Sequence, residues 1–234
     1  MRSAIVTGGQ GFIGRHVVKA LRRRGVNVRT LGRRRSVETT HIVLEEVGAE
    51  YSTKRIDFAK TQQRSPEYLK VNPKGRVPAL VTDRGILTET PAMLVFVAQL
   101  FPAARLAPID DPFTFAEMQA FNSYLCSTLH IAHAHRMRGH RWVDADDAAS
   151  IAAMQRKVPQ SVGACYDLIE HDMLKGPWVM GERYTICDPY LFTLAQWLET
   201  DGVDPKRIPR VIDHRCRVAE RAAVRKAIAE ELSA

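Results

Sequence analysis

The sequence predicts a mixed α/β domain followed by an all-helical domain, and three observations support this fold class. From Asn27 onward, short β-rich runs alternate with helical stretches and with glycine or proline turns. From Phe113 onward, apolar residues instead recur at helical spacing almost to the C-terminus. The chain has 234 residues, a length that suits two small domains.

The composition is that of an ordinary globular chain, with 45% hydrophobic and 26% charged residues. The longest uninterrupted apolar run, residues 92–98, is far shorter than the roughly 20 residues of a membrane-spanning helix. The four cysteines lie far apart, which indicates neither a disulfide framework nor a zinc site. We therefore expect a chain without a membrane segment that works in a reducing cytoplasm.

The net charge of +8 is concentrated in one short arm. Residues 1–35 hold ten Lys and Arg and no Asp or Glu, which leaves 24 basic against 26 acidic residues, about −2, in the rest. The main body therefore gives no electrostatic reason to expect a nucleic-acid partner. An Arg-rich, acid-free N-terminus also suits a transit peptide, but the glycine pattern within it favours folded structure.

This arm has the pattern of a strand, a glycine turn and a helix. Ser3–Thr7 is β-rich and meets the turn GGQGFIG at residues 8–14, and an amphipathic stretch then runs to Gly25. The turn resembles the dinucleotide fingerprint of extended short-chain dehydrogenases and epimerases, and Arg33–Arg35 would suit the 2′-phosphate of NADP. The resemblance stops at residue 35, without further βα units or a Tyr-x-x-x-Lys pair. We therefore expect residues 1–26 to be an incomplete βα extension.

Residues 27–102 have the element order βαβαββα, which is typical of a thioredoxin-like domain. The proline-containing segment after Asn72 excludes an ordinary central strand position, and Asp83-Arg84-Gly85 favours a hairpin turn. A helix is expected to begin at Thr90, with its hydroxyl as the cap and Pro91 at the first helical position. The expected strands are 27–31, 51–58, 77–81 and 86–87, and the expected helices are 41–47, 66–71 and 90–100.

The stretch from His41 to Pro102, with SPEYLKVNPKGRVPAL and LTETPAMLVFVAQLFP, resembles the bacterial glutathione S-transferases nearly element by element. GPWVMG at 176–181 and TICDPYLF at 185–192 resemble the helical domain of that family. The resemblance covers about residues 36–234 and implies a glutathione-binding domain at 27–102 and an all-helical domain at 112–234. It also implies a cytoplasmic homodimer for detoxification, which joins glutathione to small, mostly apolar electrophiles with no cofactor beyond this co-substrate.

Several residues correspond to the glutathione site of the family. Val77-Pro78 resembles its cis-proline turn, where the backbone of residue 77 would pair with the cysteinyl part of glutathione like an added strand. At the helix start, amides and the Thr90 hydroxyl would attract the γ-glutamyl carboxylate while Glu89 holds the ammonium group. A helix cap, a rigid turn and solvated loop charges are the simpler alternatives. The candidates for the glycyl carboxylate are Lys60, Lys74 and Arg76.

Two residues are candidates for activating the thiol. The family uses Ser, Tyr or Cys at the start of the first helix, and Ser36 takes that place in a loop, GRRRSVE at 32–38, that departs from the family pattern. Its hydroxyl could stabilise a thiolate beside helical amides, or Ser36 could be only an N-cap with Thr39 at N3. His130 matches a position where bacterial members place a histidine facing the thiol. Four histidines lie between 130 and 140, but we expect no metal because no carboxylate or thiolate completes a site.

A glutathione transferase is the leading hypothesis, and two alternatives stay open. One is a non-catalytic glutathione-binding, thiol-binding or interaction module of the same fold, and the other is an NADP-binding protein that uses the N-terminal glycine turn. We expect the dinucleotide site to fail because strand 27–31 should be flanked by 51–58 and 77–81, which leaves Ser3–Thr7 no edge there. Residues 1–26 would then be appended, pair at an outer edge or be poorly ordered.

Overall fold

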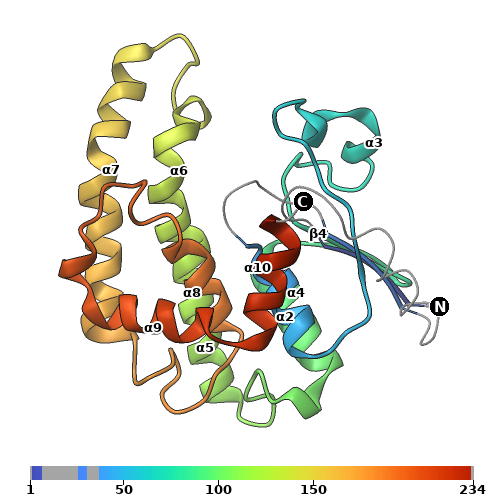
Figure 1. The fold of residues 1–234 in the computed structure, drawn as a ribbon. Helices are drawn as coiled ribbons and strands as arrows, with labels where there is room; N and C mark the ends of the chain where they lie inside the picture. Colours follow the sequence, from blue (N-terminus) through green and yellow to red (C-terminus); the bar gives the residue numbers. More distant parts are fainter. Residues whose placement is uncertain (1, 7–25, 31–36, 233–234) are drawn as a thin grey trace. The chain divides into compact units, whose positions relative to one another are not determined.

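The computed structural model of the chain describes residues 2–6, 26–30 and 37–232 (Figure 1). The chain forms two compact units, Met1–Ile109 with Ala219–Ala234, and Asp110–Val218. The predicted fold class is confirmed, because the first unit mixes strands with helices and the second is helical. The C-terminal helix, α10 (Ala222–Leu232), belongs to the first unit, although the sequence placed it in the helical domain.

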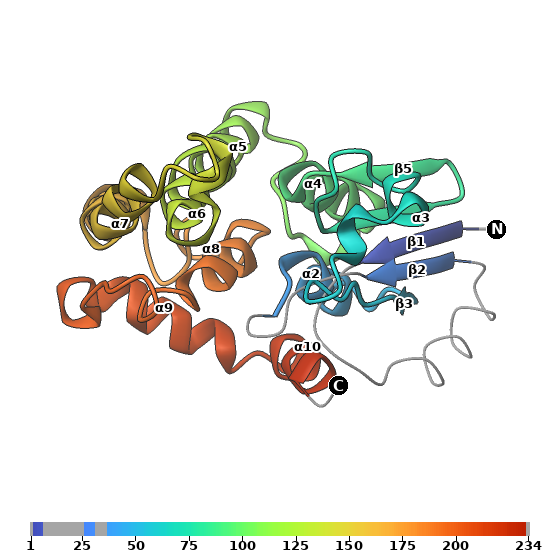
Figure 2. The ribbon, with the colours of Figure 1, turned by 90° about the horizontal axis from the view of Figure 1, so that it is seen from above.

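The first unit contains two small sheets. In one, β1 (Arg2–Val6) lies between β2 (Val26–Thr30) and β3 (Ser52–Thr53) and pairs in parallel with both. In the other, β4 (Ala79–Thr82) and β5 (Gly85–Thr88) form an antiparallel hairpin. Figure 2 shows β1, β2 and β3 side by side.

The central position of β1 shows that the expected strand order was wrong. The strand at 27–31 was expected between 51–58 and 77–81, but β1 takes a central place and β2 is at the edge of its sheet. The physical reason is the length of the available edges. β1 and β2 are in register from Arg2–Val26 to Val6–Thr30, whereas β3 offers only two residues. Of the predicted strand 51–58, only Ser52–Thr53 is paired, and the segment meets a turn at Asp57, whose carboxylate accepts a hydrogen bond from the Ala59 N–H at 3.0 Å.

Helix α10 packs on helix α2 (Thr39–Glu46) in the first unit. Helix α2 begins two residues before the predicted position, because the Glu38 carboxyl group caps it by accepting the N–H groups of Thr40 and His41 at 2.9 and 3.2 Å. The first six residues of α2 are buried, and α10 packs on this helix. The polar residues at the start of α2 are therefore enclosed rather than solvated.

Two further helices follow β3. The short helix α3 (Pro66–Leu69) is capped by Ser65, and helix α4 (Thr90–Leu100) buries Met93, Leu94, Val97 and Ala98. The spacing of these four residues places them on one face, which is how an amphipathic helix meets a core. Helix α4 also packs against α2, so its first turn is held at a fixed place in the unit.

The second unit is built from helices. Helices α6 and α7 pack side by side, and π-helical turns lie directly before α6 and directly after α7. Among the helices that the structure describes, none is both long and apolar enough to cross a bilayer. The elements are α5 (Pro112–Tyr124), the π turn Leu125–Leu129, α6 (His130–Arg138), α7 (Ala148–Leu168), the π turn Ile169–Met173, α8 (Cys187–Ala195) and α9 (Pro209–Ala219).

Candidate glutathione site

The turn that precedes β4 is fixed by two buried side chains. The Val77-Pro78 peptide bond is cis. The carbonyl of Arg76 accepts hydrogen bonds from the Tyr68 hydroxyl at 2.5 Å and from Asn72 Nδ2 at 2.7 Å. Burial raises the pKa of the Tyr68 hydroxyl, which keeps it protonated as a donor. These two hydrogen bonds therefore hold the peptide group between Arg76 and Val77 in one orientation.

The backbone of Val77 stands just outside the hairpin ladder, which begins with the Ala79–Thr88 pair. Within the described part of the chain, neither the N–H nor the C=O of Val77 makes a hydrogen bond. A donor and an acceptor on one extended residue can pair with a peptide as an added strand does. The position therefore suits the backbone of an extended peptide ligand.

The start of α4 combines an open helix end with a strained residue. Thr90 was predicted to be the cap, but it is the first helical residue, and Glu89 is the N-cap with φ +71° and ψ 118°. The helix therefore begins one residue earlier than predicted, directly after Glu89, whose backbone is not helical. No side chain of the described residues caps the helix, so its first amides stay open to a ligand. A positive φ at a residue with a Cβ costs about 1–3 kcal/mol, and such strain gathers at ligand sites.

Lys74 is the basic candidate that reaches this helix start. Its Nζ donates to Thr88 Oγ1 at 2.8 Å and forms an ion pair with the Glu89 carboxylate. The two charged side chains are 43% and 58% exposed. Lys60 and Arg76 are also exposed, and no hydrogen bond or ion pair joins either side chain to Glu89 in the described residues. The structure thus brings Lys74 to the start of α4, next to Glu89 and Thr90. Lys60 and Arg76 make no contact of this kind with Glu89 in the part of the chain that the structure describes.

The two predicted catalytic residues belong to different parts of the chain. Ser36 lies outside the described residues, but its alternative role as the N-cap of the first helix is wrong, because Glu38 caps α2. His130 is the first residue of α6, and its exposed ring lies 5.4 Å from the Trp197 ring and 6.3 Å from the His133 ring, measured between centroids.

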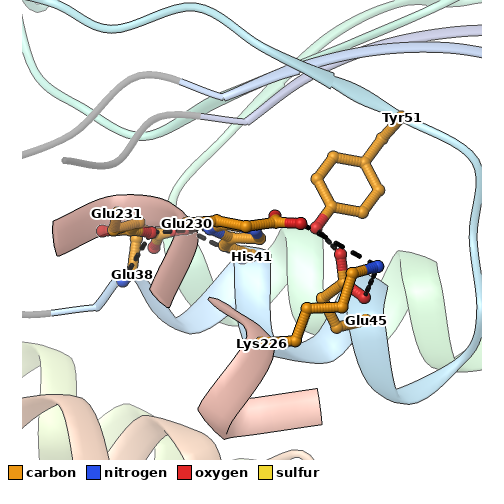
Figure 3. A network of polar contacts seen from close by, with 7 residues as sticks. All are labelled: Glu38, His41, Glu45, Tyr51, Lys226, Glu230 and Glu231. Atoms are coloured by element: carbon orange, nitrogen blue, oxygen red, sulfur yellow. Dashed lines mark hydrogen bonds and ion pairs between the residues drawn. The ribbon is translucent and has the colours of Figure 1, made fainter. Parts of the chain in front are cut away.

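A buried polar network, which the sequence analysis missed, joins the start of α2 to the end of α10 (Figure 3). His41 is fully buried, with Nδ1 2.7 Å from Glu231 Oε1 and Nε2 3.2 Å from Glu230 Oε2. Burial opposes the charged ring, but the hydrogen bonds to the two carboxylates outweigh it and raise the pKa of His41 to about 9. The ring is therefore a cation held between two carboxylates at neutral pH.

Glu231 also ties α10 to the residue that caps α2, because its Oε1 accepts the Glu38 N–H at 3.1 Å. Burial, together with the nearby charge of Glu231, raises the pKa of the Glu38 carboxyl to about 8. On the other side of the network, Glu45 accepts the Tyr51 hydroxyl and the ammonium of Lys226.

One group in this network has the chemistry of a metal site. His41, Glu45 and Glu230 offer ligand atoms that lie within 4.8 Å of one another. The positive charges of His41 and Lys226 already face these carboxylates, with Lys226 Nζ 2.6 Å from Glu45 Oε2. The negative charges of Glu45 and Glu230 are therefore balanced by His41 and Lys226, and the group forms an ion-pair cluster without a metal ion.

The chain is similar to known proteins of one family. The model of the glutathione S-transferase N-terminal domain matches residues 27–99. Glutathione S-transferase GstA of Escherichia coli O157:H7 is 29% identical over 195 residues, which are 82% of this chain and 92% of that protein.

Solved structures match over a longer span. A glutathione transferase homologue from Sulfitobacter, crystallised with bound glutathione, is 37% identical, with 99% of each chain covered and a TM-score of 0.81. The β-class glutathione S-transferase of Sphingomonas chungbukensis is 29% identical, with 83% of this chain and 94% of that chain covered and a TM-score of 0.71. With a domain match over the α/β unit and a homologue of the same extent at 37% identity, this chain belongs to the glutathione S-transferase family.

Proposed function

We propose that the protein binds glutathione and joins its thiol to small, mostly apolar electrophiles. The observation that carries the proposal is the helix start at Glu89 and Thr90, where open amides, a hydroxyl and a strained carboxylate residue stand together. The glutathione that is bound in the Sulfitobacter homologue supports the same ligand here.

The γ-glutamyl end of glutathione carries both a carboxylate and an ammonium group. The carboxylate would take the open amides and the Thr90 hydroxyl at the N-terminus of α4. The ammonium would take the Glu89 carboxylate, which already binds the ammonium of Lys74. When glutathione binds, its ammonium group and Lys74 would compete for the Glu89 carboxylate. Lys74 would then move toward the carboxylates of the ligand.

The rest of the tripeptide would follow the chain. Its cysteinyl N–H and C=O would pair with the backbone of Val77, next to the cis peptide bond. Lys60 or Arg76 would then face the glycyl carboxylate, since both are exposed and have no ion-pair partner among the described residues. This assignment keeps a cation available at each end of the ligand.

In the reaction that we propose, the thiol of bound glutathione loses its proton to solvent and the thiolate sulfur attacks an electrophilic carbon. An S–C bond forms and the leaving group departs with its electron pair. Ser36 and His130 are the candidates that would stabilise the thiolate. The protein would act mainly by holding the thiolate and the electrophile together.

A turnover assay with glutathione and a generic aryl halide tests this function and separates it from a non-catalytic module. We expect turnover, and we expect Ser36→Ala to lower the rate more than His130→Ala does. Glutathione binding without turnover would instead favour the non-catalytic module. If Ser36→Ala leaves the rate intact, thiolate stabilisation passes to His130, to backbone amides or to no group of this chain.

We also propose a homodimer in solution, since two-fold assemblies are the commonest soluble oligomers. Light scattering should give twice the 26.3 kDa mass of one chain at micromolar concentration, and the mass of one chain would contradict this.

The NADP hypothesis needs its own measurement, because the pairing of β1 with β2 removes the edge argument against it and the glycine turn 8–14 lies outside the described residues. We still expect no NADPH binding tighter than about 10 μM, because the antiparallel hairpin β4–β5 follows in place of further parallel βα units.

A further inference from the structure

A buried carboxylate in the helical unit has no role in the function proposed above. Asp201 lies in the turn after α8, and its side chain is only 2% exposed. Its two carboxylate oxygens lie 2.7 and 2.9 Å from Nδ1 of His133, and Arg136 Nε lies 3.0 Å from Oδ1. An unpaired buried carboxylate would be costly, so these two side chains of α6 stabilise Asp201 in this position.

The turn that carries Asp201 is closed on Trp197. The Asp201 N–H lies 2.9 Å from the Trp197 carbonyl and 3.1 Å from the Leu198 carbonyl, and the Val203 N–H donates to Leu198 at 3.1 Å. Gly202 adopts φ +76°, a conformation that glycine accepts without strain. Asp201 and Trp197 therefore belong to one turn that is closed by backbone hydrogen bonds.

His133 connects this turn to α6 in two ways. Its ring stacks on the Trp197 ring with 4.1 Å between centroids and 22° between planes. Its Nδ1 is bound to Asp201, which fixes the rotation of the ring about its own axis. A stack alone would allow the ring to turn in its plane, but the stack and the hydrogen bond together leave one orientation.

His130 lies one helical turn before His133, on the same face of the helix. It follows the π turn Leu125–Leu129 directly, and turns of this kind are frequent at functional sites. Its ring is tilted against the Trp197 ring at 5.4 Å, and His130 is exposed whereas His133 is buried. In this cluster, the imidazole of His130 is exposed to solvent, while His133 and Asp201 below it are buried and hydrogen-bonded to each other.

We propose that Asp201 and His133 are positioning residues that hold the His130 imidazole in one orientation by fixing the Trp197 ring beneath it. An exposed histidine on a helix otherwise samples several rotamers, and fixing one of them lowers the entropic cost of placing the ring against a reacting thiol. The kinetic consequence rests on the proposed function, in which His130 is a candidate for stabilising the thiolate, whereas the structural consequence does not.

The test measures the orientation of His130 by NMR and its effect by kinetics. The His130 ring protons are assigned by their absence in His130→Gln, and the Trp197 ring current should shift them from the position of a freely exposed histidine. In Asp201→Asn and in His133→Phe, we expect them to move at least halfway back toward that position. We expect kcat for conjugation to fall about tenfold in both variants. The KM for glutathione should stay within about twofold, because the residues proposed to bind the tripeptide lie in the other unit.

The matched control is Glu199→Gln, which removes the ion pair of Glu199 with Arg215 two residues before Asp201. It should change neither the His130 signals nor kcat. His133→Phe keeps an aromatic ring on Trp197 and serves if Asp201→Asn does not fold. His130 signals that stay at their wild-type positions in a folded variant would overturn the proposal. Absence of turnover in the wild-type protein would contradict the proposed function, while the NMR shifts would still decide the positioning role.

Discussion

Two ion-pair clusters of the α/β unit use the same chemistry in opposite environments. In the first, His41 is fully buried between Glu230 and Glu231 and joins the two helices α2 and α10. In the second, Lys74 and Glu89 meet in solvent at the start of α4. Both clusters pair a cation with a carboxylate next to a helix N-terminus, but only in the first is the cation buried.

The difference teaches what each cluster can do. A buried pair cannot lose one partner without leaving a desolvated charge, so we expect the fold of the unit to depend on the intact network around His41. An exposed pair contributes little to stability, and it can release one partner to a ligand. The Lys74–Glu89 pair is therefore suited to bind a zwitterion, and the network around His41 is suited to hold the helix whose first turn follows Ser36.

The largest effect that we expect is on stability. His41→Leu should lower the free energy of unfolding by about 3–5 kcal/mol, because it leaves buried carboxylates without their cation. Lys74→Met is the matched control from the exposed cluster, and it should cost less than about 1 kcal/mol. Urea unfolding of both variants measures the difference. Equal losses in the two variants would contradict the division between a stabilising and an exchangeable cluster.

Stability should also fall as the pH rises, because of the buried network. The protonated ring of His41 has a folded pKa of about 9, so its contribution is complete below the unfolded pKa of about 6.5 and is lost as the pH rises through 9. The Glu38 carboxyl has a folded pKa of about 8, so its ionisation also costs stability between about pH 4.5 and pH 8. Urea unfolding at pH 6 and at pH 9 should show the lower free energy at pH 9. A higher value at pH 9 would show that neither group is protonated as described.

A smaller effect separates strain from binding at the exposed cluster. Glu89→Gly should raise the free energy of unfolding by about 1 kcal/mol, because glycine accepts the positive φ of this residue. Glu89→Ala keeps the strain and serves as the control for loss of the carboxylate. Thermal unfolding of the two variants should therefore give the higher midpoint for glycine. A lower midpoint for glycine would show that the backbone of Glu89 is not strained.

The local turn and helix signals in the sequence pointed to the residues around the exposed cluster, and their role in binding glutathione stays a prediction. Val77-Pro78 and the Glu-Thr-Pro helix start were found because proline and capping residues act over a few neighbours. The error at Thr90 was one residue, which is the usual uncertainty of a helix end. The cis peptide bond at Val77-Pro78 was expected from the family resemblance, whereas the pairing of Lys74 with Glu89 was not predicted.

The buried network could not be predicted in the same way. His41 and Glu231 are 190 residues apart in sequence, and α10 had been assigned to the other domain. The available signal was a histidine and a glutamate at the start of an otherwise apolar helix, which indicates buried polar groups that need partners. The central position of β1 was missed for a related reason, because strand order depends on which edges pair and not on local propensity.

Calorimetry of glutathione binding tests the central claim most directly. The wild-type protein should bind glutathione, and Glu89→Ala should weaken binding by about 1–3 kcal/mol through loss of the ammonium contact. Asp83→Ala, in the exposed hairpin turn, should leave the affinity unchanged. The account predicts this loss together with an unchanged fold. Wild-type affinity in Glu89→Ala, or no binding by the wild-type protein, would contradict it.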